Sequence, residues 1–191
     1  MTITTDTGFS TDLVAGTWAI DPSHSEVGFT VRHLMSKVRG QFTQFEGALT
    51  TGRSLAETRA EATIDLNSVD TRDEKRDAHL RSGDFFDVEN NGPMTFTSTS
   101  VVDGGKGMLV TGDLSIKGVT KPVTLDVEVL GTDSDPWGGT RVGFEGTATI
   151  SRKEFGVDFN IPMDGGRLLI GDKVDITVAA QAVLQQDEAT A

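Results

Sequence analysis

The sequence predicts an all-β fold of antiparallel strands, and three observations support this prediction. From Trp18 onward, apolar and polar residues alternate with a period of two, which is typical of strands that bury one face. The segments between these runs are short and rich in Gly and Asp, which favours hairpins over parallel crossovers. Only the segment near residues 72–86 breaks the alternation. We therefore expect an up-and-down meander of about eight to ten strands with one short helical segment.

Six runs carry the alternation along the chain. Their inward members are Val27, Phe29 and Val31; Ala62, Ile64 and Leu66; Met94, Phe96 and Ser98; Val123, Leu125, Val127 and Val129; Val142 and Phe144; and Val174, Ile176, Val178, Ala180 and Ala182. Turn signals separate several of these runs, at residues 103–107, 117–118, 131–139 and 164–166. A long sheet with one apolar face can close as a barrel or fold over as a sandwich. Closure would remove the exposed edges of the meander.

The segment from Thr71 to Phe86 has the features of a short helix. Asp73 is placed to cap its first turn, Ala78 and Leu80 lie within it, and Gly83 lies near its end. The residues after Gly83 would turn the chain back toward the next strand. Before the first long run, we expect Trp18 to be a core aromatic of the first strand.

The chain of 191 residues has the length of one domain. We expect a flexible N-terminal segment over residues 1–15, a barrel domain over 16–184 and a flexible tail over 185–191. The first sixteen residues lack the basic and apolar regions of a signal peptide. No stretch approaches the roughly 20 apolar residues that would span a bilayer. These features predict a cytoplasmic protein without an integral membrane segment.

The composition excludes several classes of function. Twenty-nine acidic residues against seventeen basic ones give a net charge of −12, which repels nucleic acid. The absence of cysteine excludes disulfides, thiolate metal sites and a cysteine nucleophile. The chain contains ten Phe and two Trp but no Tyr. Because Phe has no hydroxyl group that needs a hydrogen-bond partner, it suits either a dry core or the wall of an apolar cavity.

The inside of a barrel allows the same two possibilities, a filled core or an apolar cavity. Eight strands enclose a space that side chains either fill or leave open for one small ligand. Several inward positions carry small residues beside large aromatic ones, a mixture that is compatible with both outcomes. The small residues are Ala62, Ser98, Ala148, Ala180 and Ala182, and the aromatic ones on the same faces are Phe29, Phe96 and Phe144.

The three histidines, His24, His33 and His79, do not have the spacing of a helical zinc site. A metal site would have to combine distant residues, and a structural His24 at a strand start is the simpler interpretation. Ser25 follows His24, but adjacent residues of a strand point to opposite faces. The chain also lacks a Gly-x-Ser-x-Gly elbow, which argues against a hydrolase.

The predicted helical segment carries mixed charges. The simple interpretation is a solvated helix face with local ion pairs. The alternative is that Arg76, Asp77 and His79 close the mouth of the barrel and contact the head group of a ligand. In a chain of net charge −12, a neutral or weakly polar head group fits better than a diphosphate.

Three segments of the chain resemble the YceI-like family of polyisoprenoid-binding, lipocalin-like proteins. They are residues 18–29, residues 76–87 with 93–99, and residues 112–123 followed by 151–156. The resemblance covers about residues 16–184 and implies an extended, antiparallel up-and-down lipocalin-like barrel. It also implies a long apolar or amphiphilic ligand, such as a polyprenyl chain, with His24 and His79 at the cavity or its rim. On this sequence we expect the chain to differ from exported members in having no leader.

We therefore predict a non-catalytic protein that binds, stores or transports a polyisoprenoid-like or fatty-acid-like or fatty-amide-like molecule, with no cofactor and no metal. The predicted contacts are Phe29, Phe42, Phe45, Phe86, Phe96, Phe144, Phe155, His24, Arg76, Asp77 and His79. One alternative is an enzyme or a metal or cofactor protein with a site near the histidines. Another is a structural or stress-related interaction protein. An unpaired strand edge would also allow a homodimer.

Overall fold

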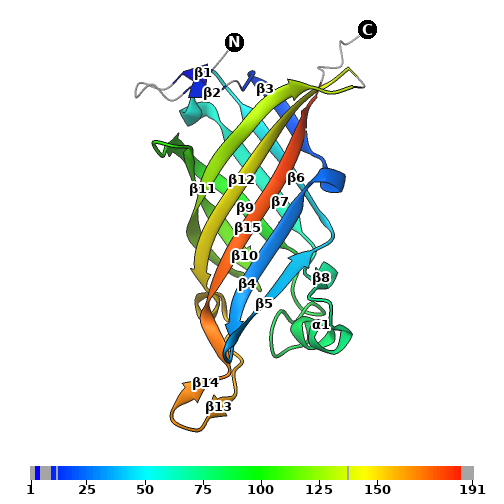
Figure 1. The fold of residues 1–191 in the computed structure, drawn as a ribbon, viewed down its shortest axis with the longest axis vertical. Helices are drawn as coiled ribbons and strands as arrows, with labels where there is room; N and C mark the ends of the chain where they lie inside the picture. Colours follow the sequence, from blue (N-terminus) through cyan, green and yellow to red (C-terminus); the bar gives the residue numbers. More distant parts are fainter. Residues whose placement is uncertain (1–2, 5–9, 12, 137, 186–191) are drawn as a thin grey trace.

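The computed structural model describes residues 3–4, 10–11, 13–136 and 138–185, which form an all-β, antiparallel structure (Figure 1). The strands are β1 (Ile3–Thr4), β2 (Ser10–Thr11), β3 (Gly16–Ile20), β4 (Glu26–His33), β5 (Ser36–Phe42), β6 (Phe45–Thr51), β7 (Arg59–Ile64), β8 (Val69–Asp70), β9 (Met94–Asp103), β10 (Met108–Ile116), β11 (Val119–Ser134), β12 (Thr140–Ser151), β13 (Pro162–Met163), β14 (Arg167–Leu168) and β15 (Ile170–Leu184). The α-helix is α1 (Glu74–Arg81), and four short 3-10 helices are η1 (Pro22–His24), η2 (Leu55–Glu57), η3 (Leu66–Ser68) and η4 (Arg152–Phe155). The predicted flexible segments fall largely outside the described residues and stay a prediction.

Eight strands close into a barrel. Strands β6, β7, β9, β10, β11 and β12 follow one another around the wall, and β15 pairs with β12 on one side and with β3 on the other. Strand β3 pairs in turn with β6, which completes the ring. The structure thus confirms the predicted up-and-down barrel and excludes the sandwich. Closure satisfies the backbone hydrogen bonds that a long meander would leave at its edges.

The two ends of the barrel differ because β15 changes its neighbour. Its C-terminal end pairs with β3, whereas the rest of the strand pairs with β4, which follows β3 after the short η1 helix. Strand β5 follows β4 and pairs with it, and on its other side it forms only two residue pairs with β8. The end where β3 starts and β15 finishes, called the upper end here, therefore has a continuous wall. At the opposite, lower end, α1 and β8 lie beside β5 (Figure 1).

Helix α1 has the predicted cap. The side chain of Asp73 accepts hydrogen bonds from the backbone N–H groups of Lys75 and Arg76, both at 3.1 Å. The helix ends at Arg81, earlier than the predicted segment, and turns continue the chain to Phe86. Its buried residue is Asp77, whose carboxylate accepts hydrogen bonds from the backbone N–H and the hydroxyl of Thr71. This pair fixes the helix to the segment that follows β8.

Side chains fill the upper end of the barrel. Trp18 is fully buried and belongs to a cluster with Leu13, Leu49, Val142 and other apolar residues. The indole N–H of Trp18 donates to the hydroxyl of Thr51 at 3.0 Å, and this hydroxyl donates to the carbonyl of Val14 at 2.6 Å. The prediction that Trp18 is a core residue of the first strand is confirmed. A second buried cluster, which includes Phe155, Leu66 and Val69, lies in the lower half.

A charged network holds the break between β3 and β4 against β12. Arg141 of β12 donates to the carboxylates of Asp21 and Asp135, at 2.6 Å each, and His24 contacts Asp21 at 2.9 Å. The hydrogen bonds from Arg141 and His24 lower the pKa of Asp21 well below its ordinary value. The same network raises the pKa of Arg141, so the pair stays ionised at neutral pH.

Candidate ligand-binding cavity

The barrel encloses two adjoining cavities. The lower cavity has a volume of 280 Å³ and the upper cavity a volume of 230 Å³. Val27, Met94 and Ile176 line both, so these three residues form a waist between the two spaces. Together the volumes fall within the range of about 300–1,000 Å³ that is typical of small-molecule sites. Of the two predicted interiors, a solid core and a hollow one, the structure has the hollow one.

Strand β15 runs along both cavities. Ile170 and Val174 line the lower cavity, Ile176 lies at the waist, and Val178 and Ala180 line the upper cavity. Alternate residues of a strand point to the same face, and the span from 170 to 180 corresponds to about 30 Å at roughly 3.3 Å per residue. The apolar face predicted for this strand therefore forms one continuous wall from the lower end to the upper core.

Small side chains leave the upper cavity open. Ala62, Ala148 and Ala180, on three different strands, line it. The other two predicted small residues do not: Ser98 is buried and accepts a hydrogen bond from the backbone N–H of Ala60, and Ala182 packs in the upper core. The space is thus produced by alanines at positions where larger apolar residues would meet across the barrel.

All seven phenylalanines named from the sequence line one of the cavities. Four line the lower cavity and three the upper: Phe29, Phe42, Phe86 and Phe155, and Phe45, Phe96 and Phe144, respectively. Phe85 and Phe159 also line the lower cavity, although they were not among the predicted contacts. Phe85 belongs to the turns after α1 and Phe159 to the segment after η4, so no alternation marks either as inward. The predicted Phe86 and Phe155 likewise lie outside the strands. The role of the seven predicted phenylalanines in ligand binding stays a prediction.

The ionisable residues that line the lower cavity are all basic. Within the described part of the chain they are His33, Arg76, His79 and Arg152, and no Asp or Glu is among them. The whole chain, by contrast, carries a net charge of −12. The lower cavity is therefore a local basic region in an acidic protein.

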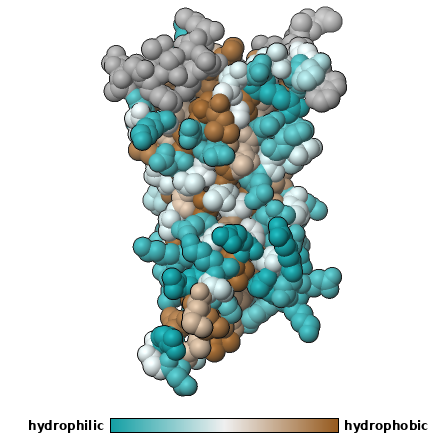
Figure 2. Space-filling model, viewed as in Figure 1, coloured by the Kyte–Doolittle hydropathy of each residue, from teal (hydrophilic) through white to brown (hydrophobic). Residues whose placement is uncertain are grey.

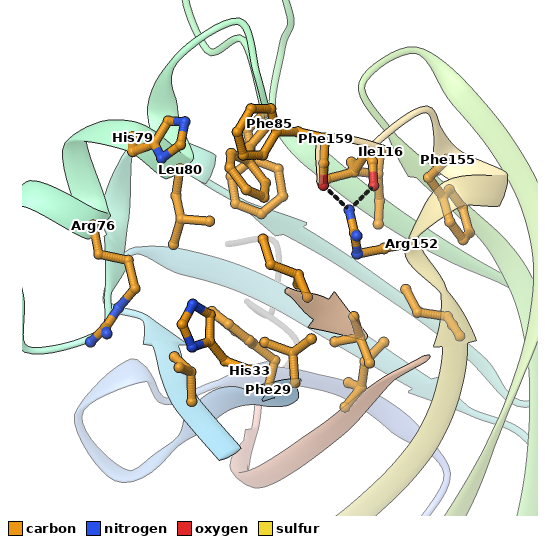
Figure 3. Close-up of a pocket in the computed structure, with 18 of the residues that line it drawn as sticks. Phe29, His33, Arg76, His79, Leu80, Phe85, Ile116, Arg152, Phe155 and Phe159 are labelled. Atoms are coloured by element: carbon orange, nitrogen blue, oxygen red, sulfur yellow. Dashed lines mark hydrogen bonds between the residues drawn. The ribbon is translucent and has the colours of Figure 1, made fainter. Parts of the chain in front are cut away.

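Arg152 is the deepest of these basic groups. It lies at the start of η4, is 6% exposed and turns toward the cavity (Figure 3). Its Nε donates to the carbonyl of Gly171 at 2.9 Å, and its Nη1 donates to the carbonyls of Val157 and Phe159 at 2.6 and 3.0 Å. Its Nη2 has no hydrogen-bond partner among the described residues. Burial lowers the pKa of the guanidinium, and the charges of Asp172 and Asp158 oppose this effect.

Arg152 is not among the contacts predicted from the sequence. It appeared only within the segment 151–156 that resembles the YceI-like family. An isolated arginine at the end of a strand is ordinarily a surface residue. Its burial results from the turn of η4, which directs the side chain inward against three backbone carbonyls. No periodic pattern indicates such a position.

Of the predicted polar contacts, Arg76 and His79 line the lower cavity from α1. The guanidinium of Arg76 donates to the hydroxyl and the carbonyl of Thr71, at 2.7 and 2.8 Å. The ring of His79 packs edge-on against Phe85 and Phe159, with centroids 5.0 Å apart in both cases, and its Nε2 contacts Asp84 at 2.8 Å. Of these contacts, the one between His79 and Phe159 joins α1 to the segment after η4.

Two of the predicted polar contacts line neither cavity. Asp77 is buried and holds Thr71, so it supports α1 from behind the cavity wall. His24 is exposed on η1 and bound to Asp21. Of the three histidines, His33 and His79 line the lower cavity and His24 does not. No cluster of three or more His, Asp or Glu side chains suited to a metal ion occurs in the part of the chain that the structure describes.

The lower cavity reaches solvent near His79 and Ile161, which line it and are exposed. Next to this opening, an apolar patch covers the lower tip of the molecule (Figure 2). It contains Leu34, Met35 and Leu168 besides Ile161, and Met35 is 94% exposed. None of the described helices is long and apolar enough to cross a membrane.

Comparisons with known proteins agree with this architecture. Residues 18–182 match the YceI-like domain family. Protein YceI of Escherichia coli O17:K52:H18 is 41% identical over 177 residues, which cover 91% of this chain and 90% of that protein. A UPF0312 protein of Pseudomonas paraeruginosa is 44% identical over 140 residues, which cover 72% of this chain and 73% of the relative.

Solved structures show the same fold. The crystal structure of BcnA from Burkholderia cenocepacia has a TM-score of 0.74 at 26% identity and covers 85% of this chain and 98% of its own. A polyisoprenoid-binding domain from Saccharophagus degradans has a TM-score of 0.62 at 16% identity, over 88% of this chain and 98% of its own, and supports the fold alone. The family match over most of the barrel and the close relatives lead to one conclusion: this chain belongs to the YceI-like domain family.

Proposed function

We propose that this protein binds a long apolar or amphiphilic molecule inside the barrel and stores or carries it without changing it chemically. The observation that carries the proposal is the pair of adjoining apolar cavities, which are closed at the upper end by the Trp18 cluster and open at the lower end. A relative in fold is described as a polyisoprenoid-binding domain, which supports a ligand of this class.

The physical basis of binding is burial of hydrocarbon. Each methylene group transferred from water to an apolar wall contributes about 0.8 kcal/mol, which is roughly a fourfold gain in affinity. A tail that enters from the lower end has to pass the waist at Val27, Met94 and Ile176 before it reaches the upper cavity. Such a site selects its ligand by length and shape more than by chemical detail.

The first test is direct. Protein purified without detergent is extracted with organic solvent, and the extract is analysed by mass spectrometry. We expect a lipid in stoichiometric amount. Binding of octan-1-ol and dodecan-1-ol by the extracted protein is then measured by calorimetry, and affinity should rise with chain length. An empty extract together with no binding of either alcohol would refute the proposal.

A waist variant tests the path of the tail. Met94→Trp fills the space between the cavities, so we expect dodecan-1-ol to lose its advantage over octan-1-ol. The matched control is Val102→Trp, on the same strand at a position that is 49% exposed. If both variants keep the full length dependence, the tail does not cross the waist.

A further inference from the structure

The unpartnered nitrogen of Arg152 points to a ligand group. A guanidinium offers five N–H donors, and the protein engages Nε and Nη1 through three backbone carbonyls. The two N–H donors on Nη2 remain without a partner in the part of the chain described. Buried polar groups are nearly always hydrogen-bonded, and each exception needs an explanation, of which a bound ligand is one. The side chain lines the lower cavity while Nη2 itself is fully buried, so a ligand in that cavity contacts Nη2 when the guanidinium turns toward it.

Arg152 also has no ion-pair partner among the described residues. All three of its hydrogen-bond acceptors are neutral carbonyls. Among the described residues no carboxylate lies within ion-pair distance of it, and none lines the lower cavity. Arg76 and His79, by comparison, already have the hydroxyl of Thr71 and the carboxylate of Asp84 as partners. The charges of Asp172 and Asp158 lie beyond ion-pair distance and offset the cost of burying the guanidinium only in part, so an anion from the ligand would lower this cost further.

We infer that Nη2 of Arg152 binds the head group of an amphiphile and that this head group is a monoanion, a carboxylate in the simplest case. The tail then extends past Met94 into the upper cavity, where the wall is apolar. This inference rests on the proposed function and specifies its ligand class. A diphosphate fits less well, because it brings more negative charge than one free nitrogen balances and is repelled by a chain of net charge −12.

The test compares two ligands that differ only in the head group. Dodecanoic acid and dodecan-1-ol are titrated into the extracted protein at pH 8, where the free acid is ionised. We expect the acid to bind about tenfold more tightly, because charge-assisted hydrogen bonds are roughly twice as strong as neutral ones. In Arg152→Met this preference should disappear, so that acid and alcohol bind with equal affinity. Equal binding of acid and alcohol by the wild type would overturn the inference and leave the proposed function intact.

Arg152 also holds the turn after β12 through its three carbonyl contacts, so two controls are needed. Arg152→Lys keeps the charge and should retain part of the preference for the acid. Arg141→Met removes an arginine from a charged network that lines neither cavity, and it should leave the preference unchanged. If Arg141→Met removes the preference as fully as Arg152→Met, general electrostatics and not Arg152 is responsible, and the inference fails.

A measurement on the wild type does not depend on any variant. Dodecanoic acid labelled with ¹³C at the carboxyl group is bound, and its chemical shift is followed by NMR as the pH falls. Contact with a guanidinium favours the ionised form, so the carboxyl pKa should be lower in the complex than in water. A raised or unchanged pKa would overturn the inference. Tighter binding of farnesyl diphosphate than of the acid would overturn it as well, whereas failure of all these ligands to bind would refute the proposed function.

Discussion

The upper and lower ends of this barrel share most of their strands but have opposite properties. At the upper end, β15 pairs with β3 and β12, and the fully buried Trp18 fills the interior. At the lower end, β4 replaces β3, β5 has only the short β8 on its other side, and the interior is a mostly apolar hollow that also contains basic side chains. The comparison shows how one change of strand partner separates a filled end from a hollow end, where we propose that a ligand binds.

The two ends also differ in the kind of polar group that lacks a partner. In the upper core Trp18 donates to Thr51, whose hydroxyl donates in turn to a backbone carbonyl. The described atom without a partner near this end is the neutral hydroxyl of Thr132, at a position that pairs with Val142. In the lower cavity it is Nη2 of Arg152, which belongs to a charged group. A buried charged donor gains more from an acceptor on a ligand than a neutral hydroxyl does.

The largest expected effect is on stability, for a substitution at the upper end. Trp18→Ala should reduce the free energy of unfolding by about 3–5 kcal/mol, because a fully buried indole leaves a large cavity. Phe86→Ala, in the half-buried wall of the lower cavity, should cost only about 1–2 kcal/mol. Urea denaturation of the two variants measures both. Equal losses would mean that the two ends contribute alike to stability.

The next effect concerns the attachment of α1 at the lower end. Asp77→Ala leaves the buried N–H and hydroxyl of Thr71 without their acceptor, which should cost about 1–3 kcal/mol. Hydrogen exchange of the α1 amides should accelerate, while that of β12 and β15 in the upper half should not. The exposed Glu74→Gln is the control and should change neither quantity. Uniform acceleration across the barrel would contradict a separate lower end.

A third prediction uses two neighbouring alanines of β15 that point to opposite faces. Ala180 lines the upper cavity and Ala179 is exposed. Ala180→Leu should weaken binding of dodecan-1-ol about tenfold, because the added methylenes occupy the space of the tail. Ala179→Leu should leave binding unchanged. Calorimetric titration distinguishes the two, and equal affinities would show that the ligand does not use the upper cavity.

The smallest expected effect lies where the two halves join. Asp21 has a lowered pKa because Arg141 and His24 bind its ionised form, so its contribution to stability is complete above its ordinary pKa of about 3.9. The contribution declines as the pH falls from that value toward the lowered pKa. The stability advantage of the wild type over Asp21→Asn should therefore be constant above about pH 5 and shrink below about pH 4. Denaturation curves at several pH values give this difference, and an advantage that grows in acid would refute the assignment.

The sequence predicted the strands and much of the cavity wall because both follow from local alternation. The inward faces of β4, β7, β9, β11, β12 and β15 and the cap at Asp73 are properties of short segments. Five of the seven phenylalanines lie on strands and line cavities, whereas Phe86 and Phe155 reach the lower cavity from a turn and from η4. Closure of the barrel over a sandwich was not predictable from the residues alone, since it depends on the pairing of β12 with β15. The YceI-like resemblance supplied it.

The features that were missed depend on contacts between distant segments. The burial of Arg152 requires the carbonyls of Val157, Phe159 and Gly171 to surround it after η4 turns inward. The waist requires Val27, Met94 and Ile176 to come together from three strands. His24, predicted at the cavity or its rim, instead lies on the outer charged network with Asp21 and Arg141. Composition and periodicity contain none of this information.

The pairing of β15 with β12, β3 and β4 also affects how the chain folds. This strand is made after all the others in the ring, and it joins β12 to β3 and β4, which lie near the opposite end of the sequence. Pairing across such a separation raises contact order, and domains dominated by non-local strand pairs fold in roughly milliseconds to seconds. Until residue 184 has left the ribosome, the apolar inner face of the incomplete sheet is exposed to water. Nascent chains in this state are candidates for binding by chaperones.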